Sequence, residues 1–276
     1  MCIRDSLGTV ANIAQAKGEL LDHIPRDGFV FLHGESPYMQ EQAKRCAGKV
    51  YYFGQENQWD LYPRDMTPEN GGYRFLAVTP WGEMELFVPL PGKHNVTNAL
   101  AAVGVGLAFG LTPVQIAEGL SSCLLSSMRL EVLEKGGIRI INDAYNANPH
   151  SMKAALQVLE DMAGNTGRLV AVLADMLEVG PRAEDAHREL GALAAEKGVS
   201  VLITVGPLAQ WIAQGALEQG MPQKQVKHCA TTQEAAEMLE SQLQSGDVVL
   251  VKGSRAMHME DVVQKISAPE GLLGQF

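Results

Sequence analysis

An α/β fold in two parts is predicted by three observations on this sequence. The chain has 276 residues, of which 46% are hydrophobic, and this is enough to bury a core and to form two domains. Residues 28–53 have the pattern strand, helix, strand, which predicts a βαβ unit. From residue 138 onward, short apolar runs alternate with amphipathic helix patterns, which predicts a parallel sheet covered by helices on both faces.

The first half divides into elements at its turn signals. Apolar spacing predicts a helix at 13–24, a strand at 28–32, a helix at 37–47 and a strand at 50–53. Residues 73–79 and 83–88 flank the sequence PWG and predict a hairpin. Residues 95–109 are apolar nearly all round, so we expect a buried helix. The sequence TPVQ at 112–115 has the capping-box pattern that begins another helix.

The second half has five strand-length apolar runs and five helix patterns. The strands are expected at 138–141, 169–173, 199–205, 226–229 and 248–251. The helices are expected at 151–163, 183–196, 208–218, 232–243 and 257–266. Residues 121–130 separate the two halves, and we place the domains at 1–127 and 128–276.

Charge and cysteine usage exclude several classes of function. The formal net charge is −10, and no run of Lys and Arg is present, which argues against nucleic acid or an anionic membrane as a partner. The four cysteines are far apart, with no CxxC pair, so neither a zinc site nor a disulfide framework is expected. They are interpreted as reduced thiols of a cytoplasmic protein. No apolar run has the length of a membrane span, and no signal peptide opens the sequence.

The segment IRIINDAYNANPHSM, at 138–152, is the most informative part of the chain. An apolar strand runs into a polar loop, after which Asn148 is a suitable N-cap and Pro149 suits the first helical position. Open α/β sheets place ligands at such strand-to-helix loops, and free N–H groups there favour an anion. Asp143 is a candidate for a ribose hydroxyl, and Tyr145 either stacks on a base or packs. The alternative is a plain capped turn.

Two further positions suggest nucleotide contacts. Asn95 and Asn98 are three residues apart, so their amides share one face of a helical turn. An amide offers a donor and an acceptor together and can therefore contact a purine edge; helix capping is the alternative. Arg129 at the domain junction is suited to clamp a phosphate, or else it forms an inter-domain salt bridge.

Polar residues also follow two other predicted strands. Asp175 and Glu178 follow one strand and are candidates to bind an amine, whereas Lys252 and Arg255 follow another and are candidates to bind a carboxylate. Each could instead be an ordinary helix cap, which is the better interpretation of Ser254. Taken alone, Lys17 and His187 are interpreted as surface residues. No GxxxxGK[ST] motif occurs in the sequence, and the glycines at 104 and 106 fall within a helix pattern.

Taken in order, these segments resemble the Mur ligases, the ATP-dependent amide-forming enzymes of peptidoglycan assembly. PGKHNVTNALAA looks like that family's GxHNxxNxLAA element. INDAYNANPHSMKAAL, VAVLADMLEVG with AHRELG, and DVVLVKGSRAMHME look like the branch that adds D-alanyl-D-alanine to UDP-N-acetylmuramoyl-tripeptide. The run YNANPxSM is the specific discriminator within the family. The resemblance covers nearly the whole chain after its first few residues.

The resemblance implies a role for each matching position. Asn98, with Asn95 or His94, would contact adenine, and Asp143 would hold the ribose. Arg129 would touch the ATP phosphates, while Tyr145 and Asn146 would line the nucleotide cleft. Lys17 matches a family lysine that is carbamylated in some members and helps to position Mg²⁺. Lys252, Ser254 and Arg255, with Asp175, would face the incoming dipeptide.

The implied function is ATP-dependent joining of D-Ala-D-Ala to UDP-N-acetylmuramoyl-tripeptide through an acyl phosphate, by a cytoplasmic monomer. Residues 1–127 would be part of the family's central ATP-binding domain, and residues 128–276 its Rossmann-like C-terminal domain. The family's P-loop, a magnesium-binding Glu and a UDP-sugar domain have no counterpart in this sequence. We therefore expect a C-terminal portion that is inactive alone. The alternatives are a related ligase, of the muramyl-tripeptide or folylpolyglutamate type, or a non-catalytic binding protein derived from one.

Overall fold

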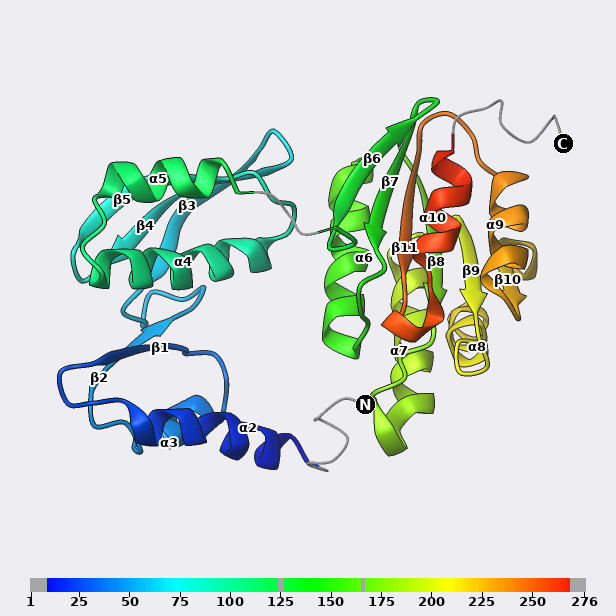
Figure 1. The fold of residues 1–276 in the computed structure, drawn as a ribbon. Coiled ribbons are helices and arrows are strands. Elements are labelled where there is room, and N and C mark those ends of the chain that lie inside the picture. Colours follow the sequence, from blue (N-terminus) through cyan, green and yellow to red (C-terminus); the bar gives the residue numbers. More distant parts are fainter. Residues whose placement is uncertain (1–8, 124–126, 165–166, 269–276) are drawn as a thin grey trace, which may run out of the picture. The chain divides into compact units, whose positions relative to one another are not determined.

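The chain forms two compact units, Met1–Leu124 and Leu125–Phe276, in a computed structural model (Figure 1). The structure describes residues 9–123, 127–164 and 167–268. Cys2 and part of the predicted boundary at 121–130 lie outside the described residues. None of the described helices is long and apolar enough to cross a membrane. Cys46, Cys123 and Cys229 are free thiols.

The first unit contains the predicted βαβ arrangement. Strand β1 (Phe29–His33) pairs in parallel with β2 (Lys49–Phe53), and α3 (Met39–Ala43) lies between them in the chain. Before them, the predicted helix at 13–24 is an α-helix, α2 (Val10–Gly18), followed by a 3₁₀ turn, η1 (Glu19–His23). Helix α3 has five residues, shorter than the pattern at 37–47 predicted.

An antiparallel sheet of three strands, in the order β3-β4-β5, follows in this unit. The predicted hairpin is confirmed as β4 (Gly72–Thr79) and β5 (Gly82–Val88). Strand β3 (Tyr62–Glu69) was not predicted, because it contains two prolines, which are tolerated at a sheet edge but disfavoured in a central strand. Its pairing with β4 shifts register between Arg64 and Thr67, where Asp65 has a φ of +53°.

One face of helix α4 (Lys93–Ala108) packs against the rest of this unit, and its other face is exposed. Val96, Leu100 and Val103 are fully buried among the strands β4 and β5. The opposite face carries Val105, which is 42% exposed. The prediction of a helix buried all round was therefore wrong, because the apolar residues of the outer face are simply left in solvent. The capping box of α5 (Pro113–Ser121) is confirmed.

The second unit is a six-stranded sheet in the order β10-β9-β8-β11-β7-β6. Its strands are β6 (Glu131–Lys135), β7 (Ile138–Asp143), β8 (Arg168–Ala174), β9 (Val201–Val205), β10 (Val226–Cys229) and β11 (Asp247–Lys252). The five predicted strands are confirmed and are parallel to one another. The edge strand β6 was not predicted, and it runs antiparallel to β7. The last strand in the sequence, β11, lies between β8 and β7.

Helices cover both faces of this sheet, as predicted (Figure 1). One face is covered by α6 (Pro149–Ala163), α7 (Ala183–Glu196) and α8 (Gln210–Glu218). The other is covered by α9 (Thr232–Glu240) and α10 (Glu260–Ser267), the latter preceded by the 3₁₀ turn η4 (Arg255–Met257). Asn148 caps α6 by accepting from Ser151 N, with Pro149 in the first helical position, which confirms both predictions.

Candidate functional site

A buried ion pair lies at the carboxyl edge of the sheet in the second unit. Asp143 ends β7 and Lys252 ends β11, and the strand register places the two residues opposite each other. Lys252 Nζ lies 2.6 Å from Asp143 Oδ2, and it also donates to Asn146 O at 2.8 Å. The Lys252 side chain is 2% exposed. Burial lowers the pKa of Lys252, although the Asp143 carboxylate opposes that shift.

Arg129 lies against Tyr145 beside this pair. The guanidinium carbon is 3.9 Å from the centre of the Tyr145 ring, which is a cation–π geometry. The neighbouring backbone is bound to the loop after β7, since Tyr145 N donates to Met128 O and Leu130 N donates to Asp143 Oδ1. Met128 and Leu130 have φ values of +61° and +53°, which are strained for residues with a side chain. These hydrogen bonds hold the strained segment in place and thereby position Arg129.

A third cation belongs to the same neighbourhood. Arg255, in η4, donates to Glu260 Oε1 at 2.6 Å, and its guanidinium also lies 3.5 Å from Met128 Sδ. Arg129 and Lys252 are close enough for Arg129 to contribute to lowering the pKa of Lys252. The predicted residues Arg129, Asp143, Tyr145, Asn146, Lys252 and Arg255 are therefore brought together. Exposed cations beside an exposed aromatic ring, with Tyr145 at 44% exposure, can bind an anionic group attached to a flat ring.

Asp175 is fully buried at the end of β8. Its Oδ1 accepts hydrogen bonds from Leu208 N and Ala209 N, at 3.0 and 2.7 Å. Asp175 thus supplies the cap that the start of α8 lacks from its own residues. Its Oδ2 is buried and has no hydrogen-bond partner among the described residues. Burial raises the pKa of Asp175 above the ordinary value.

Ser254 joins the end of β11 to the loop after β8. Ser254 N donates to Asp175 O at 3.0 Å, and Ser254 Oγ accepts from Leu177 N at 2.9 Å. Both Asp175 and Ser254 are buried, so their polar atoms hold loops together. Of the four residues predicted to face the dipeptide, Arg255 is the exposed one.

His187 is buried, and its interpretation as a surface residue was wrong. Its Nε2 accepts from Met176 N at 3.0 Å, and its Nδ1–H donates to Ala183 O at 2.6 Å. The ring is therefore held in its neutral form, and burial lowers its pKa. The available signal was helical spacing, because His187 shares a face with Leu190 and Ala194.

In the first unit, the two predicted amides are hydrogen-bonded to each other. Asn95 Nδ2 donates to Pro91 O at 2.8 Å, and Asn98 Nδ2 donates to Asn95 Oδ1 at 3.3 Å. Asn95 is 7% exposed, whereas Asn98 is exposed and His94 is half-buried. Gln55, which sequence reasoning missed, donates to Thr97 Oγ1 from the loop after β2.

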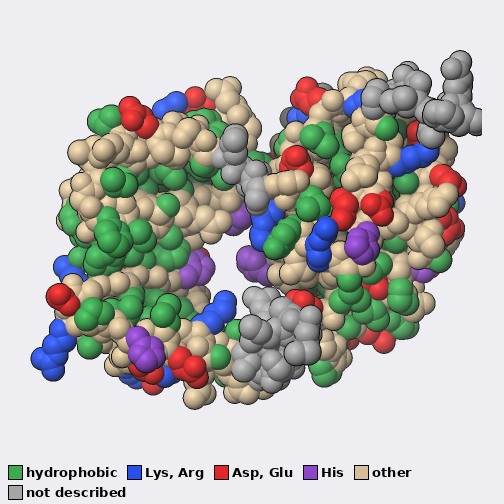
Figure 2. All heavy atoms as spheres, viewed as in Figure 1, with side chains coloured by type: hydrophobic (Ala, Val, Ile, Leu, Met, Phe, Trp, Pro, Cys, Tyr) green, Lys and Arg blue, Asp and Glu red, His purple; other side chains and the backbone are tan. Residues whose placement is uncertain are grey.

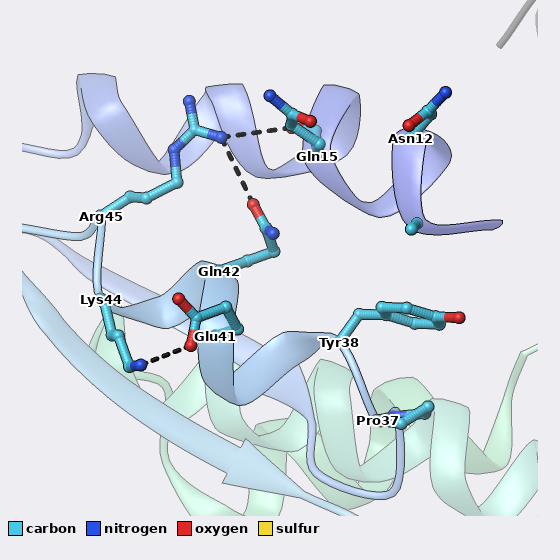
Figure 3. Close-up of a pocket in the computed structure, with 9 residues that line it drawn as sticks. Asn12, Gln15, Pro37, Tyr38, Glu41, Gln42, Lys44 and Arg45 are labelled. Carbon is cyan, nitrogen blue, oxygen red and sulfur yellow. Dashed lines mark hydrogen bonds and ion pairs between the residues drawn. The ribbon is translucent and has the colours of Figure 1, made fainter. Parts of the chain in front are cut away.

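Lys17 is exposed in the last turn of α2. A nearby cavity of about 580 Å³ lies between α2 and α3 (Figure 3). Its charged groups are paired within the protein, Lys44 with Glu41 and Arg45 with Asp22, so it offers little charge to a ligand. Among residues 9–123, 127–164 and 167–268 there is no group of three or more His, Cys, Asp or Glu side chains that could hold a metal ion.

The surface charge is mixed. On the face shown in Figure 2, acidic and basic side chains are scattered over both units, and no large basic patch is seen. The formal net charge of the whole sequence is −10.

Comparisons with known proteins agree on one family. Residues 4–106 match the family described as Mur ligase middle domain, and residues 128–255 match the one described as Mur ligase, glutamate ligase domain. The chain belongs to the Mur ligase family. It is 36% identical over 261 residues to the UDP-N-acetylmuramoyl-tripeptide--D-alanyl-D-alanine ligase of Bacillus subtilis, covering 94% of this chain and 56% of that protein.

Solved structures of Mur ligases have the same fold. The crystal structure of MurF from Acinetobacter baumannii matches with a TM-score of 0.81 and 30% identity, over 94% of this chain and 56% of that one. MurF ligase from Thermotoga maritima, solved in complex with ADP, matches with a TM-score of 0.79 and 23% identity, over 95% of this chain and 58% of that one. This Mur ligase chain therefore spans a little over half the length of the relatives that it matches.

Proposed function

We propose that this chain serves an ATP-dependent amide ligase that joins D-Ala-D-Ala to UDP-N-acetylmuramoyl-tripeptide. The observation that carries the proposal is the cluster of Arg129, Tyr145, Asp143 and Lys252 at the carboxyl edge of the sheet. This cluster is suited to a nucleotide, and it occurs in a chain whose named relatives catalyse this ligation. The run YNANPHSM at 145–152, which distinguishes this branch of the family, begins with Tyr145 of this cluster and forms the loop after β7 and the start of α6.

Each residue has a role that follows from its contacts. Asp143 accepts hydrogen bonds from Lys252 Nζ and Leu130 N, and a carboxylate oxygen can accept more than one hydrogen bond, which suits it to a ribose hydroxyl. Arg129 is exposed and carries a permanent charge that suits phosphate oxygens. Asn98 presents an exposed amide to adenine. Tyr145 and Asn146 shape the wall beside the ribose.

The reaction proceeds in two steps in this proposal. A carboxylate oxygen of the tripeptide attacks the γ-phosphorus of ATP, and ADP leaves. The dipeptide amine then attacks the acyl carbon, loses a proton and displaces inorganic phosphate. No protein nucleophile takes part, so the protein contributes by positioning the reactants and by neutralising phosphate charge, for which Arg129 is the suited group.

Mg²⁺ binding belongs to the proposal, since this ion commonly binds one or two carboxylates together with the phosphates of a nucleotide. Lys17 would help to position the ion after carbamylation, which converts its amine into an oxygen ligand. Its exposure leaves the amine accessible to CO₂.

The dipeptide carboxylate is assigned to Arg255, because its side chain is 51% exposed and contacts Glu260 through Nη1, whereas Lys252 is 2% exposed. Asp175 and Ser254 act by shaping the adjoining loops. We further propose a cytoplasmic monomer with no nucleic-acid or membrane partner; the free thiols of the described cysteines are in keeping with a reducing compartment.

Calorimetric titration of the chain with ADP tests the nucleotide site. We expect saturable binding, and we expect Arg129→Met to weaken it by about ten-fold or more, since the variant loses a hydrogen bond to a charged group. Lys153→Met, which removes a surface cation paired with Glu189, is the control and should bind ADP like the parent. Equal affinities of the R129M variant and the parent would contradict the role of Arg129.

A second titration tests the substrate class. D-Ala-D-Ala should bind in the presence of ADP, and L-glutamate, diaminopimelate and D-alanine should not displace it. Displacement by L-glutamate would instead favour a ligase of the folylpolyglutamate type. Failure of all four amines to bind would favour a non-catalytic binding protein.

A further inference from the structure

We propose that Asn95 is a positioning residue that fixes the amide orientation of Asn98, so that the first unit selects a 6-amino purine over a 6-oxo purine. The inference rests on the proposed function, which places the adenine of ATP at Asn98. The inference concerns which side of the Asn98 amide, the N–H donor or the oxygen acceptor, faces each position of the base.

Pro91, Asn95 and Asn98 form a chain of two hydrogen bonds, which we call the relay. Its fixed end is the backbone carbonyl of Pro91. Pro91 O can accept but not donate, so the Asn95 group that faces it at 2.8 Å must be the NH₂. Gly92, with a φ of +90°, turns the chain between these two residues, a conformation that glycine adopts readily. Asn95 is 7% exposed, so reversing its amide would bury two oxygens against each other. Its Oδ1 therefore points away from Pro91.

The second step passes this orientation to Asn98. Asn95 Oδ1 can only accept, and Asn98 lies one helical turn later with its Nδ2 at 3.3 Å. Asn98 must therefore turn its NH₂ toward Asn95. Among the described residues the Asn98 side chain makes this one hydrogen bond, and the residue is exposed. Its carbonyl oxygen and its second N–H remain available to a ligand in a fixed order.

The order of donor and acceptor matters because 6-amino and 6-oxo purines have opposite patterns along the edge formed by position 6 and N1. Adenine has a donor at position 6, flanked by acceptors at N1 and N7. Hypoxanthine has an acceptor at position 6 and a donor at N1. At the edge formed by position 6 and N1, an amide whose oxygen accepts from the adenine N6 amine and whose N–H donates to N1 would set its oxygen against O6 of hypoxanthine. A reversed amide would instead donate to O6 and accept from N1–H of hypoxanthine. Locking the amide therefore selects the base.

The helical turn that carries the relay is itself held in place. Gln55 Nε2 donates to Thr97 Oγ1 and lies 3.4 Å from Lys93 O, which ties the first turn of α4 to the loop after β2. Thr97 is adjacent to Asn98 in the chain. The relay is thus anchored at Pro91 and at Gln55.

Binding of ADP and inosine diphosphate to the 276-residue chain and its variants tests this inference. The parent should prefer ADP by about ten-fold or more, the scale of one bidentate amide–base contact. Asn95→Leu frees the Asn98 amide to reverse and should bring the two affinities within about three-fold of each other. Asn95→Asp keeps an acceptor facing Asn98, and in the protonated form its hydroxyl can donate to Pro91 O, so at low pH this variant should retain the preference. Thr112→Val weakens the start of the neighbouring helix α5 and should also retain it.

The outcomes separate this inference from the proposed function. Equal binding of both nucleotides by the parent, or an undiminished preference in the N95L variant, would overturn the relay while leaving nucleotide binding intact. Binding of neither nucleotide would contradict the proposed function and base selection together.

The relay also has a readout that needs no ligand. In ¹⁵N-labelled chain, the side-chain amide protons of Asn95 should exchange with water far more slowly than those of the exposed Asn57. They should also show through-bond coupling to the Pro91 carbonyl. Exchange of Asn95 as fast as that of Asn57 would overturn the relay, whatever the nucleotides do.

Discussion

The two units hold their candidate binding groups by different means. In the second unit the site is built on charge, because Asp143 and Lys252 form an ion pair in which the lysine is 2% exposed. In the first unit it is built on neutral amides, and the outermost, Asn98, is exposed to solvent. Removing one partner of a buried ion pair lowers the free energy of unfolding strongly, so changes at such a site also destabilise the fold. Breaking hydrogen bonds between neutral amides should cost little stability. Because these bonds fix which way the Asn98 amide faces, their loss should instead change the preference between purine bases.

The largest effect is expected from Lys252→Met. This variant removes the ammonium that faces the Asp143 carboxylate, whose side chain is 13% exposed, so we expect the free energy of unfolding to fall by about 3–5 kcal/mol. The additional change Asp143→Asn should restore part of the loss, since no uncompensated charge then remains. Urea unfolding of the two variants measures both effects. A loss of the size expected for a surface pair, below about 1 kcal/mol, would break the contrast between the units.

A smaller loss is expected from Asp175→Ala. Leu208 N and Ala209 N would lose their acceptor at the start of α8, and an unsatisfied buried donor costs about 1–3 kcal/mol. Asp175→Asn keeps one acceptor oxygen and should be milder. Thermal unfolding, with hydrogen exchange of these two amides, measures the change. Unchanged protection in the D175A variant would contradict the capping role.

His187 predicts how stability depends on pH. Burial lowers its pKa in the folded protein below the ordinary 6.5, so the unfolded chain takes up a proton first as pH falls. The contribution of this group to stability is therefore complete above pH 6.5 and is lost as pH falls from 6.5 toward the folded-state pKa. His187→Asn should flatten this part of the profile. Identical slopes between pH 7 and pH 5 for the parent and the H187N variant would show that His187 does not cause the decline.

The smallest effect on stability is expected from Asn98→Ala. The side chain is exposed and makes one hydrogen bond to a described residue, so the free energy of unfolding should change by no more than about 0.5 kcal/mol. Affinity for ADP should nevertheless fall. The K252M variant should therefore mainly lower stability, whereas the N98A variant should mainly lower affinity for the nucleotide. Severe destabilisation by this change would remove the distinction.

Much of the second unit could be predicted from the sequence, because its signals are local. Asn148 and Pro149 mark the start of α6 within a few residues, and the apolar runs of its parallel strands are continuous. Strand β6 was missed, since a five-residue run with alternating charges gives only a weak pattern, although Gly136 and Gly137 mark the turn into β7.

The contacts of the site could not be predicted in the same way. Asp143 and Lys252 are 109 residues apart, and they meet only because β11 lies beside β7. Strand order depends on the packing of the whole sheet, so no local sequence pattern near either residue predicts that they pair. The sequence grouped Lys252 with Arg255 by proximity in the chain, whereas the structure pairs it with Asp143.

The central place of β11 in its sheet has a consequence for biosynthesis. Strands β7 and β8 precede β11 in the chain, yet in the sheet they are joined to each other through β11. In a nascent chain, β7 and β8 therefore cannot be bridged, and the Asp143–Lys252 ion pair cannot form, until residue 252 emerges. Ligand capture at this edge can therefore begin only after β11 has been made and has paired with both strands.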